Sequence, residues 1–196
     1  MPPPRWPEPV VLLDGSVALL RDVEAADEPE LRRLFAGMAP EMARRRWFGA
    51  ATSMPANARW AAHPEAAGAV GLVAEQDGHI VAHGVAVPDG PEAEVAFAVA
   101  DDRHGVGLAT TLLQHLAARA LELGFDALRA HVLWGNREML EVLEHACPTS
   151  HKSRDGDGIH VRVSARAIVR NSARALPYKP ATGAGPMPEV TPQTGP

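Results

Sequence analysis

The sequence predicts a single α/β domain built on a mixed β-sheet, and three observations support that prediction. Helix-like and strand-like segments alternate along the chain, with three strand-like segments in succession near its middle. A glycine-containing turn at 105–107 joins a strand pattern to a long amphipathic helix pattern. The last strands are separated by a helix, so their pairing requires a crossover, and the sheet contains parallel as well as antiparallel strands.

Proline content sets the expected limits of the folded unit. The chain of 196 residues is long enough for one well-buried core, and no internal repeat is visible. Residues 1–9 are rich in proline and are expected to be flexible. Residues 173–196 form a second proline-rich segment that cannot bury enough apolar surface to become ordered. The expected domain therefore spans residues 10–172.

The first elements are a strand and a helix. Ser16–Arg21 alternates as a strand does, and Asp27 followed by Glu30 indicates a helix start. The helix should bury one face at i, i+3, i+4, i+7 spacing, formed by Leu31, Leu34, Phe35 and Met38. Two shorter helices are expected next, from Pro40 to Trp47 and over Pro55–Ala61.

A three-stranded antiparallel meander follows. Val70–Glu75 and Ile80–Val87 flank Asp77-Gly78, a dipeptide typical of a tight hairpin turn. Glu92–Ala100 is the third strand. The meander ends immediately before the glycine-containing turn.

The last third of the chain predicts helix, strand, helix and strand. Gly107–Leu123 is a helix with a leucine stripe, and Gly124 ends it. Asp126–Leu133 is a strand, after which Asn136 caps a helix that carries Met139, Leu140 and Leu143. The turn at Asp157-Gly158 leads into the final strand, Ile159–Ser164.

The segment from Asp101 to Thr110 is the most informative part of the chain. A strand, a glycine turn and a helix start together form an anion-binding cradle, because the helix presents free backbone N–H groups and the positive end of its dipole. Glycines allow the backbone to approach the ligand closely. A diphosphate fits such a site. The absence of Gly-Lys-Ser/Thr argues against a P-loop, and the absence of a third glycine argues against a dinucleotide fingerprint.

The element order and these residues resemble the GCN5-related N-acetyltransferase (GNAT) superfamily over residues 14–166. The family signature Gln/Arg-x-x-Gly-x-Gly/Ala is matched by His104, Gly107 and Ala109, with histidine as a departure at the first position. Asn136 matches a second landmark after the following strand. Residues 31–49, which contain Phe35, Pro40, Arg46, Trp47 and Phe48, resemble the first helices of bacterial protein-lysine acetyltransferase domains.

The resemblance implies a GNAT fold. The expected sheet is mixed and six- to seven-stranded, with an antiparallel N-terminal meander, one parallel pair at the cofactor site and about four flanking helices. It also implies acetyl-CoA as the acetyl donor and a primary amine, such as a protein lysine, as the acceptor. The implied cofactor-binding residues are Ala98, Val99, His104, Gly105, Val106, Gly107, Ala109, Thr110 and Asn136.

Glu94 is the candidate general base. A lysine amine is neutral only about once in a thousand molecules at pH 7, so a carboxylate near the thioester is needed to take its proton. Glu94 lies on the strand that leads into the phosphate turn, and Ala96 and Ala98 share its face if that strand is regular. A β-bulge, which similar proteins have in this strand, would change which of these side chains share a face. Glu92 and His131 are the alternatives.

The proton for the leaving thiolate has no obvious donor. Many proteins of this superfamily use a tyrosine as the acid, and the only tyrosine here is Tyr178, in the proline-rich tail. Either no acid is needed, or a water or the neighbourhood of Cys147 supplies the proton. A backbone N–H near Val99 would stabilise the charge on the thioester oxygen, as the resemblance implies. A catalytically silent acyl-CoA-binding module and an interaction protein that works through its tail remain the alternative functions.

Composition excludes some classes of partner and favours one compartment. The net charge of −5 argues against nucleic acid, and no apolar run is long enough to cross a membrane. A single cysteine and the absence of a signal pattern favour a cytoplasmic protein. No metal is expected, because His145, Cys147 and His151 lack a clear fourth ligand. Trp134 fits equally well in an acceptor pocket or over the core. Arg44, Arg45 and Arg46 fit a solvated helix face, and the resemblance to the lysine acetyltransferase branch leaves contact with a partner or the cofactor as the alternative.

Overall fold

The computed structural model describes residues 7–38, 54–156 and 158–172. Its centre is one mixed sheet in the order β1-β2-β3-β4-β5-β6-β8-β7. The strands are β1 (Glu8–Val11), β2 (Val17–Asp22), β3 (Val70–Gln76), β4 (His79–Asp89), β5 (Glu92–Val99), β6 (Ala127–Leu133), β7 (His151–Asp155) and β8 (Gly158–Ser164). The α-helices are α1 (Glu28–Gly37), α3 (Met54–Ala62), α4 (Leu108–Glu122), α5 (Arg137–Ala146) and α6 (Ala165–Ser172).

Parallel pairing occurs between β5 and β6, while the other neighbouring strands of the described sheet run antiparallel. The α/β class, the antiparallel meander and the single parallel pair are confirmed. The crossover expected between the last strands was wrong: β6 and β8 pair antiparallel, and the crossover joins β5 to β6 through α4. The sheet has eight strands, so the expected six to seven was too low. Five α-helices lie in the described residues, one more than the expected four.

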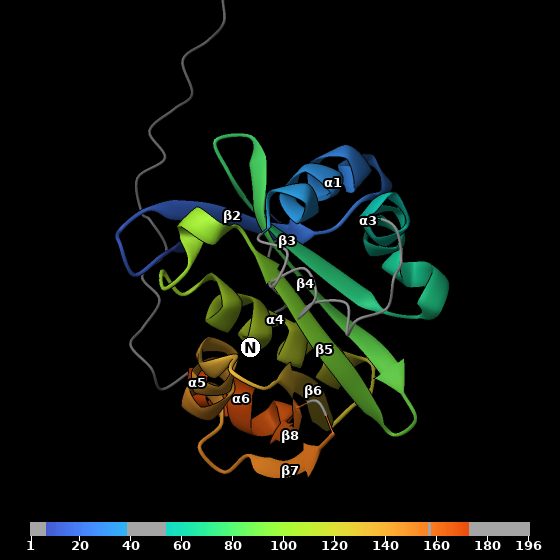
Figure 1. Ribbon diagram of the computed structural model, residues 1–196, viewed down its shortest axis with the longest axis vertical. Helices are drawn as coiled ribbons and strands as arrows, with labels where there is room; N and C mark the ends of the chain where they lie inside the picture. The colour runs from blue at the N-terminus through green and yellow to red at the C-terminus, as the bar shows by residue number, and fades with distance from the viewer. Residues whose placement is uncertain (1–6, 39–53, 157, 173–196) are drawn as a thin grey trace, which may run out of the picture.

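Two apolar clusters cover the two faces of the sheet. The larger cluster joins α4 and the apolar sides of α5 and α6 to the strands, with Leu112 and Leu116 fully buried. The smaller cluster packs α1 and α3 against β3, β4 and β5 on the other face, around Leu31 and Phe35. Figure 1 shows α1 and α3 at one end of the sheet and α5, α6 and β7 at the other. The predicted apolar face of α1 is confirmed, since Leu34 and Met38 are also buried.

Gly84 of β4 allows α4 to lie close against the sheet. A Cβ at Gly84 would come 3.1 Å from Leu116 Cδ1 and 3.2 Å from Phe97 Cδ1, so a larger residue would push α4 away. Because α4 begins directly after the glycine-containing turn, the packing of α4 against the sheet also fixes the position of that turn.

The meander hairpin is confirmed in detail. Asp77 and Gly78 have φ values of 52° and 76°, as a two-residue turn of the type favoured in hairpins requires. The helices expected at Pro55–Ala61 and Gly107–Leu123 are present as α3 and α4. The helix expected from Pro40 to Trp47 and the flexible tail at 173–196 lie outside the described residues.

Three elements were not expected from the sequence. β1 begins at Glu8 and pairs with β2, so ordered structure reaches into the predicted flexible segment 1–9. Pro9 is tolerated there because β1 is an edge strand. β7 is the edge strand at the other end of the sheet, and α6 follows β8 without a loop.

The start of α1 is organised differently from the prediction. Asp27 occupies the N-cap position, but its side chain makes no cap hydrogen bond to α1. Its carboxylate instead accepts hydrogen bonds from the Glu24 backbone N–H at 2.8 Å and from the Arg21 guanidinium at 2.7 and 2.8 Å. Arg21 also contacts Glu75, so this network joins β2, β3 and the start of α1.

Replacing Asp27 with asparagine should destabilise the fold and change its response to acid. Burial raises the pKa of the Asp27 carboxyl, but the hydrogen bonds from Arg21 and from the Glu24 backbone outweigh burial, so the pKa is held below the ordinary 3.8. The stability that this group contributes is present above its unfolded pKa and is lost as the pH falls through the folded value. We expect Asp27→Asn to cost about 2 kcal/mol at neutral pH and to flatten the decline below about pH 4.

Urea unfolding across that pH range measures both effects. Asp126→Asn is a matched control, because Asp126 is a largely exposed aspartate that also pairs with an arginine, Arg166. This control should change the free energy of unfolding by less than about 1 kcal/mol. Equal losses in the two variants would contradict the role assigned to Asp27.

Candidate active site

The site is built around the divergence of β5 and β6. The two strands pair only at Ala93 with Leu128 and at Glu94 with Arg129, and beyond this point β5 and β6 are no longer paired. On the other side of β5, Ala100 N–H donates to the Val81 carbonyl at 2.9 Å, and the register with β4 is regular along the whole strand. β5 therefore has no bulge in its pairing with β4, and Glu94, Ala96 and Ala98 lie on the same face of the strand.

The register decides which backbone groups of β5 face the gap. Hydrogen-bonded and non-hydrogen-bonded pairs alternate in an antiparallel ladder, and the bond from Ala100 sets the phase. The backbone groups of Ala98 therefore point toward β4, while those of Phe97 and Val99 point away from it, toward the gap. Val99 was expected at the site, but Phe97 was missed. Which residues of β5 turn their backbone groups toward the gap depends on the pairing of β5 with β4, and the sequence alone does not give that pairing.

The glycine-containing turn lies at the end of β5, where the gap opens. Gly105 and Gly107 have φ values of 76° and 94°, and a Cβ at Gly105 would meet nothing within 4 Å. Thr111 N–H donates to the Gly107 carbonyl at 3.0 Å, which closes the first turn of α4. The N–H groups of the three residues before Thr111, namely Leu108, Ala109 and Thr110, thus have no carbonyl within the helix and mark its positive end. Open space in front of a glycine and a helix N-terminus suits a diphosphate.

His104 and Asn136 stand on the two sides of the gap. His104 Nε2 lies 3.3 Å from the Val99 carbonyl oxygen on the β5 side. Its Nδ1 lies 3.3 Å from Glu138 Oε2 in the first turn of α5, which follows β6. Asn136 caps α5, as predicted, by accepting a hydrogen bond from the Met139 N–H at 3.3 Å. His104 therefore links the end of β5 to the helix that follows β6.

The loop between β1 and β2 supports the turn and was missed by the sequence reasoning. Leu13 N–H donates to the Val106 carbonyl at 3.0 Å, and the Leu13 side chain is 82% exposed. A Cβ at Gly107 would lie 3.4 Å from Leu13 Cγ. The sequence shows an apolar residue, Leu13, directly before the turn residues Asp14 and Gly15, which is the available signal. It does not show that Leu13 contacts the turn before α4.

Glu94 is the carboxylate next to the point of divergence. Its side chain is 32% exposed, and Oε2 lies 3.8 Å from Arg129 Nη2 on β6. Glu92 lies on the same face of β5 and pairs with Arg162 of β8. His131, the other alternative base, is stacked against His160 with ring centroids 4.5 Å apart. Among these groups, Glu94 lies at the last paired position before the gap.

Several predicted site residues lie elsewhere or outside the described parts. The side chain of Ala98 is 2% exposed and packs with α1 and α3, so its role as a cofactor contact stays a prediction. Cys147 is buried in the larger apolar cluster, and its Sγ lies 3.7 Å from Thr149 Oγ1. Trp134 is half exposed and donates to the Gly156 carbonyl at 3.3 Å, so it does not cover the core. Tyr178 and Arg44–Arg46 are outside the described residues.

Within residues 7–38, 54–156 and 158–172, no group of three or more His, Cys, Asp or Glu side chains is arranged to hold a metal ion. In the same residues, no helix combines the length and the apolar character needed to span a membrane.

Comparison with protein families identifies the chain. The family model for the acetyltransferase (GNAT) family matches residues 29–147. The chain belongs to this family. No match was found among curated protein sequences.

Solved structures agree with this membership. The GNAT domain of S. lividans PAT superposes with a TM-score of 0.71 and 28% sequence identity, covering 81% of this chain and 97% of that one. Mycobacterium smegmatis RimJ in complex with CoA-disulfide has a TM-score of 0.59 and 19% identity, with 86% and 95% coverage. Salmonella typhimurium yncA with its cofactor acetyl-CoA has a TM-score of 0.58 and 16% identity, with 76% and 95% coverage. The latter two similarities concern the fold.

Proposed function

We propose that this GNAT domain transfers an acetyl group from acetyl-CoA to a primary amine, with a protein lysine as the acceptor. The observation that supports the proposal most strongly is the gap between β5 and β6, with the glycine turn and the start of α4 at its opening. The likeness to the GNAT domain of PAT, at 28% identity, favours the branch that the early helices suggested. A cytoplasmic location is part of this proposal.

The residues present fit acetyl-CoA. The turn from His104 to Thr110 would hold the diphosphate through backbone N–H groups, with Gly105 and Gly107 allowing close approach. Val99, and with it Phe97, would offer backbone groups to the extended arm of the coenzyme, much as a neighbouring strand would. Asn136 would line the β6 side of the gap. Bound acetyl-CoA supplies an activated thioester, and the protein supplies binding, orientation and proton transfer.

Glu94 is proposed to act as the general base. Its carboxylate would take a proton from the acceptor ammonium, directly or through one water, so that the neutral amine can attack the thioester carbon. The Val99 N–H would stabilise the negative charge that develops on the thioester oxygen. A thiolate whose conjugate acid has a pKa near 8.5 leaves without an acid. The burial of Cys147 argues against that residue as a proton donor.

The experiment combines binding and turnover. Isothermal titration with CoA tests the cofactor site, and the release of free CoA thiol from acetyl-CoA tests transfer to a panel of lysine peptides and small amines. Saturable CoA binding with thiol release on an amine supports the proposal. Binding without turnover on any amine would instead favour a catalytically silent acyl-CoA-binding module, and an absence of binding would contradict both.

A further inference from the structure

One face of the C-terminal half of the sheet carries a row of polar side chains beside Glu94. Glu94 pairs with Arg129 on β6, Arg129 pairs with Arg162 on β8, and Arg162 pairs with His151 on β7. Residues directly opposite one another across neighbouring strands share a face of the sheet. The row therefore continues from the proposed base across three further strands. Among the described helices, α4, α5 and α6 pack on the other face.

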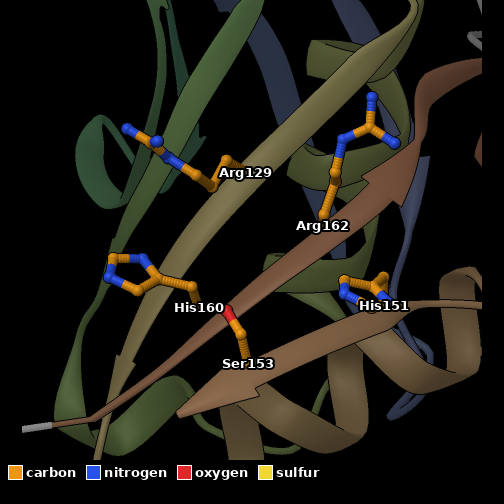
Figure 2. Close-up of a pocket in the computed structure, with 5 residues that line it drawn as sticks. All are labelled: Arg129, His151, Ser153, His160 and Arg162. Carbon is orange, nitrogen blue, oxygen red and sulfur yellow. The ribbon is translucent and has the colours of Figure 1, made fainter. Parts of the chain in front are cut away.

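A hollow of about 260 Å³ lies in this face. It is lined by Arg129, His151, Ser153, His160 and Arg162, which Figure 2 shows on three neighbouring strands. The lining contains two guanidinium groups, two imidazoles and a hydroxyl, and no carboxylate. All of these groups can donate hydrogen bonds, and arginine in particular presents donors in a fork that matches the two oxygens of a carboxylate or phosphate.

Among the described side chains, the carboxylates that pair with the two arginines of the hollow are Asp89, Glu92 and Glu94. Arg162 pairs through Nε with Glu92, and Arg129 contacts Asp89 and Glu94. These three carboxylates come from β4 or β5, so they contact the arginines from the side of the hollow that is nearest to β5. An arginine carries five N–H donors, and one contact through Nε leaves the terminal nitrogens of Arg162 able to bind another acceptor. The β7 side of the hollow presents His151 and Ser153.

We infer that this hollow binds an oxyanion, a carboxylate or a phosphate monoester, on a peptide close to the lysine that is acetylated. The inference rests on the proposed acetyltransferase function and extends it to a class of acceptor. Acidic or phosphorylated segments would be acetylated in preference to neutral ones. The hollow would fix the peptide while Glu94 takes the proton from the lysine.

The spacing of the strands favours a peptide over a small amine as the acceptor. Neighbouring strands lie roughly 4.8 Å apart, so Arg162 and Glu94 are separated by roughly 10 Å across the sheet. An extended peptide advances by about 3.3 Å per residue. A lysine at Glu94 and an acidic or phosphorylated residue three positions away span this separation.

The test compares three peptides that share one acceptor lysine. Three residues from the lysine, the first has glutamate, the second has phosphoserine and the third has glutamine. We expect kcat/KM for acetylation of the glutamate or phosphoserine peptide to exceed that of the glutamine peptide by about tenfold. Comparing glutamate with phosphoserine shows which oxyanion is preferred. Equal values for all three peptides would overturn the inference and leave the acetyltransferase proposal intact.

Variants locate the effect in the hollow. Arg162→Gln should abolish most of the preference, while Arg162→Lys should retain part of it because the charge remains. The double variant Arg162→Gln/Glu92→Gln removes both members of the ion pair, and its peptide preference should equal that of Arg162→Gln. That result would show that an unpaired Glu92 does not cause the loss of preference. Arg166→Gln is the matched control, because Arg166 is an exposed arginine on α6 that pairs with Asp126. A preference that survives in Arg162→Gln would contradict the assignment.

A binding measurement separates this inference from the proposed function. In protein labelled with ¹⁵N, the imidazole signals of His151 and His160 should shift saturably on titration with the glutamate peptide. They should remain unchanged with the glutamine peptide or in Arg162→Gln. This readout needs no turnover, so it decides the inference even if no peptide is acetylated. An absence of shifts with both the glutamate and the phosphoserine peptide would overturn it.

Discussion

Glu94→Gln should lower kcat for acetyl transfer by about 100-fold or more, with little change in affinity for CoA. Glutamine has the same shape but cannot accept a proton at neutral pH. The acceptor would then attack only in the small fraction of molecules that are already neutral, about one in a thousand for a lysine at pH 7. The loss should shrink as the pH approaches the pKa of the amine. Thiol release across a pH series, together with CoA titration, measures both parts.

Two variants sharpen this test. Glu122→Gln is the control, because Glu122 is a half-exposed glutamate that pairs with Arg119 at the far end of α4. It should leave kcat unchanged. Glu92→Gln tests the alternative base on the same face of β5, and we expect a smaller loss than for Glu94→Gln. Full activity in Glu94→Gln, or a 100-fold loss confined to Glu92→Gln, would remove Glu94 from the role of base.

The elements that the sequence predicted correctly are those with strong local signals. Asp77-Gly78 can form its turn with little help from the rest of the chain, because both residues tolerate positive φ. The apolar stripe of α4 and the cap at Asn136 are likewise encoded within a few residues of each other. The single parallel pair followed from the family resemblance, and the register of β5 and β6 bears it out.

The missed elements depend on contacts with distant parts of the chain. β7 consists of polar residues on an edge of the sheet, so it has no apolar alternation to indicate a strand. β1 carries Pro9, which indicates a break unless the strand is known to be an edge. The carboxylate of Asp27 accepts hydrogen bonds from Arg21 and from the Glu24 backbone N–H instead of capping α1, because β2 places the guanidinium of Arg21 beside it.

The polar hollow illustrates the same limit at the candidate site. Arg129, His160 and Ser153 are far apart in sequence and belong to three strands, and only the register of those strands places them together. Read singly, each is an ordinary polar position on a half-exposed strand. The candidate base, Glu94, could be proposed from its place on one strand, whereas the surface proposed to select the acceptor could not be proposed from the sequence.

Gly107→Val should weaken CoA binding by about tenfold or more and have the second-largest effect. Gly107 is the N-cap of α4 with φ 94° and ψ 2°, a conformation that a β-branched residue adopts only with strain. Space alone does not forbid the change, since the nearest atom to a Cβ would be Leu13 Cγ at 3.4 Å. The expected loss therefore comes from the backbone, which must relax toward negative φ. That relaxation would turn the N–H groups at the start of α4 away from the position proposed for the diphosphate.

Gly124→Val separates this effect from general destabilisation. Gly124 follows the other end of α4, has φ 91°, and has no atom within 4 Å of a Cβ, so its backbone strain is matched. Both variants should lose stability to a similar extent in thermal unfolding. Only Gly107→Val should raise the Kd for CoA measured by isothermal titration. Equal CoA affinity in the two variants would show that the turn before α4 does not hold the coenzyme, and the positive end of that helix would then need another explanation.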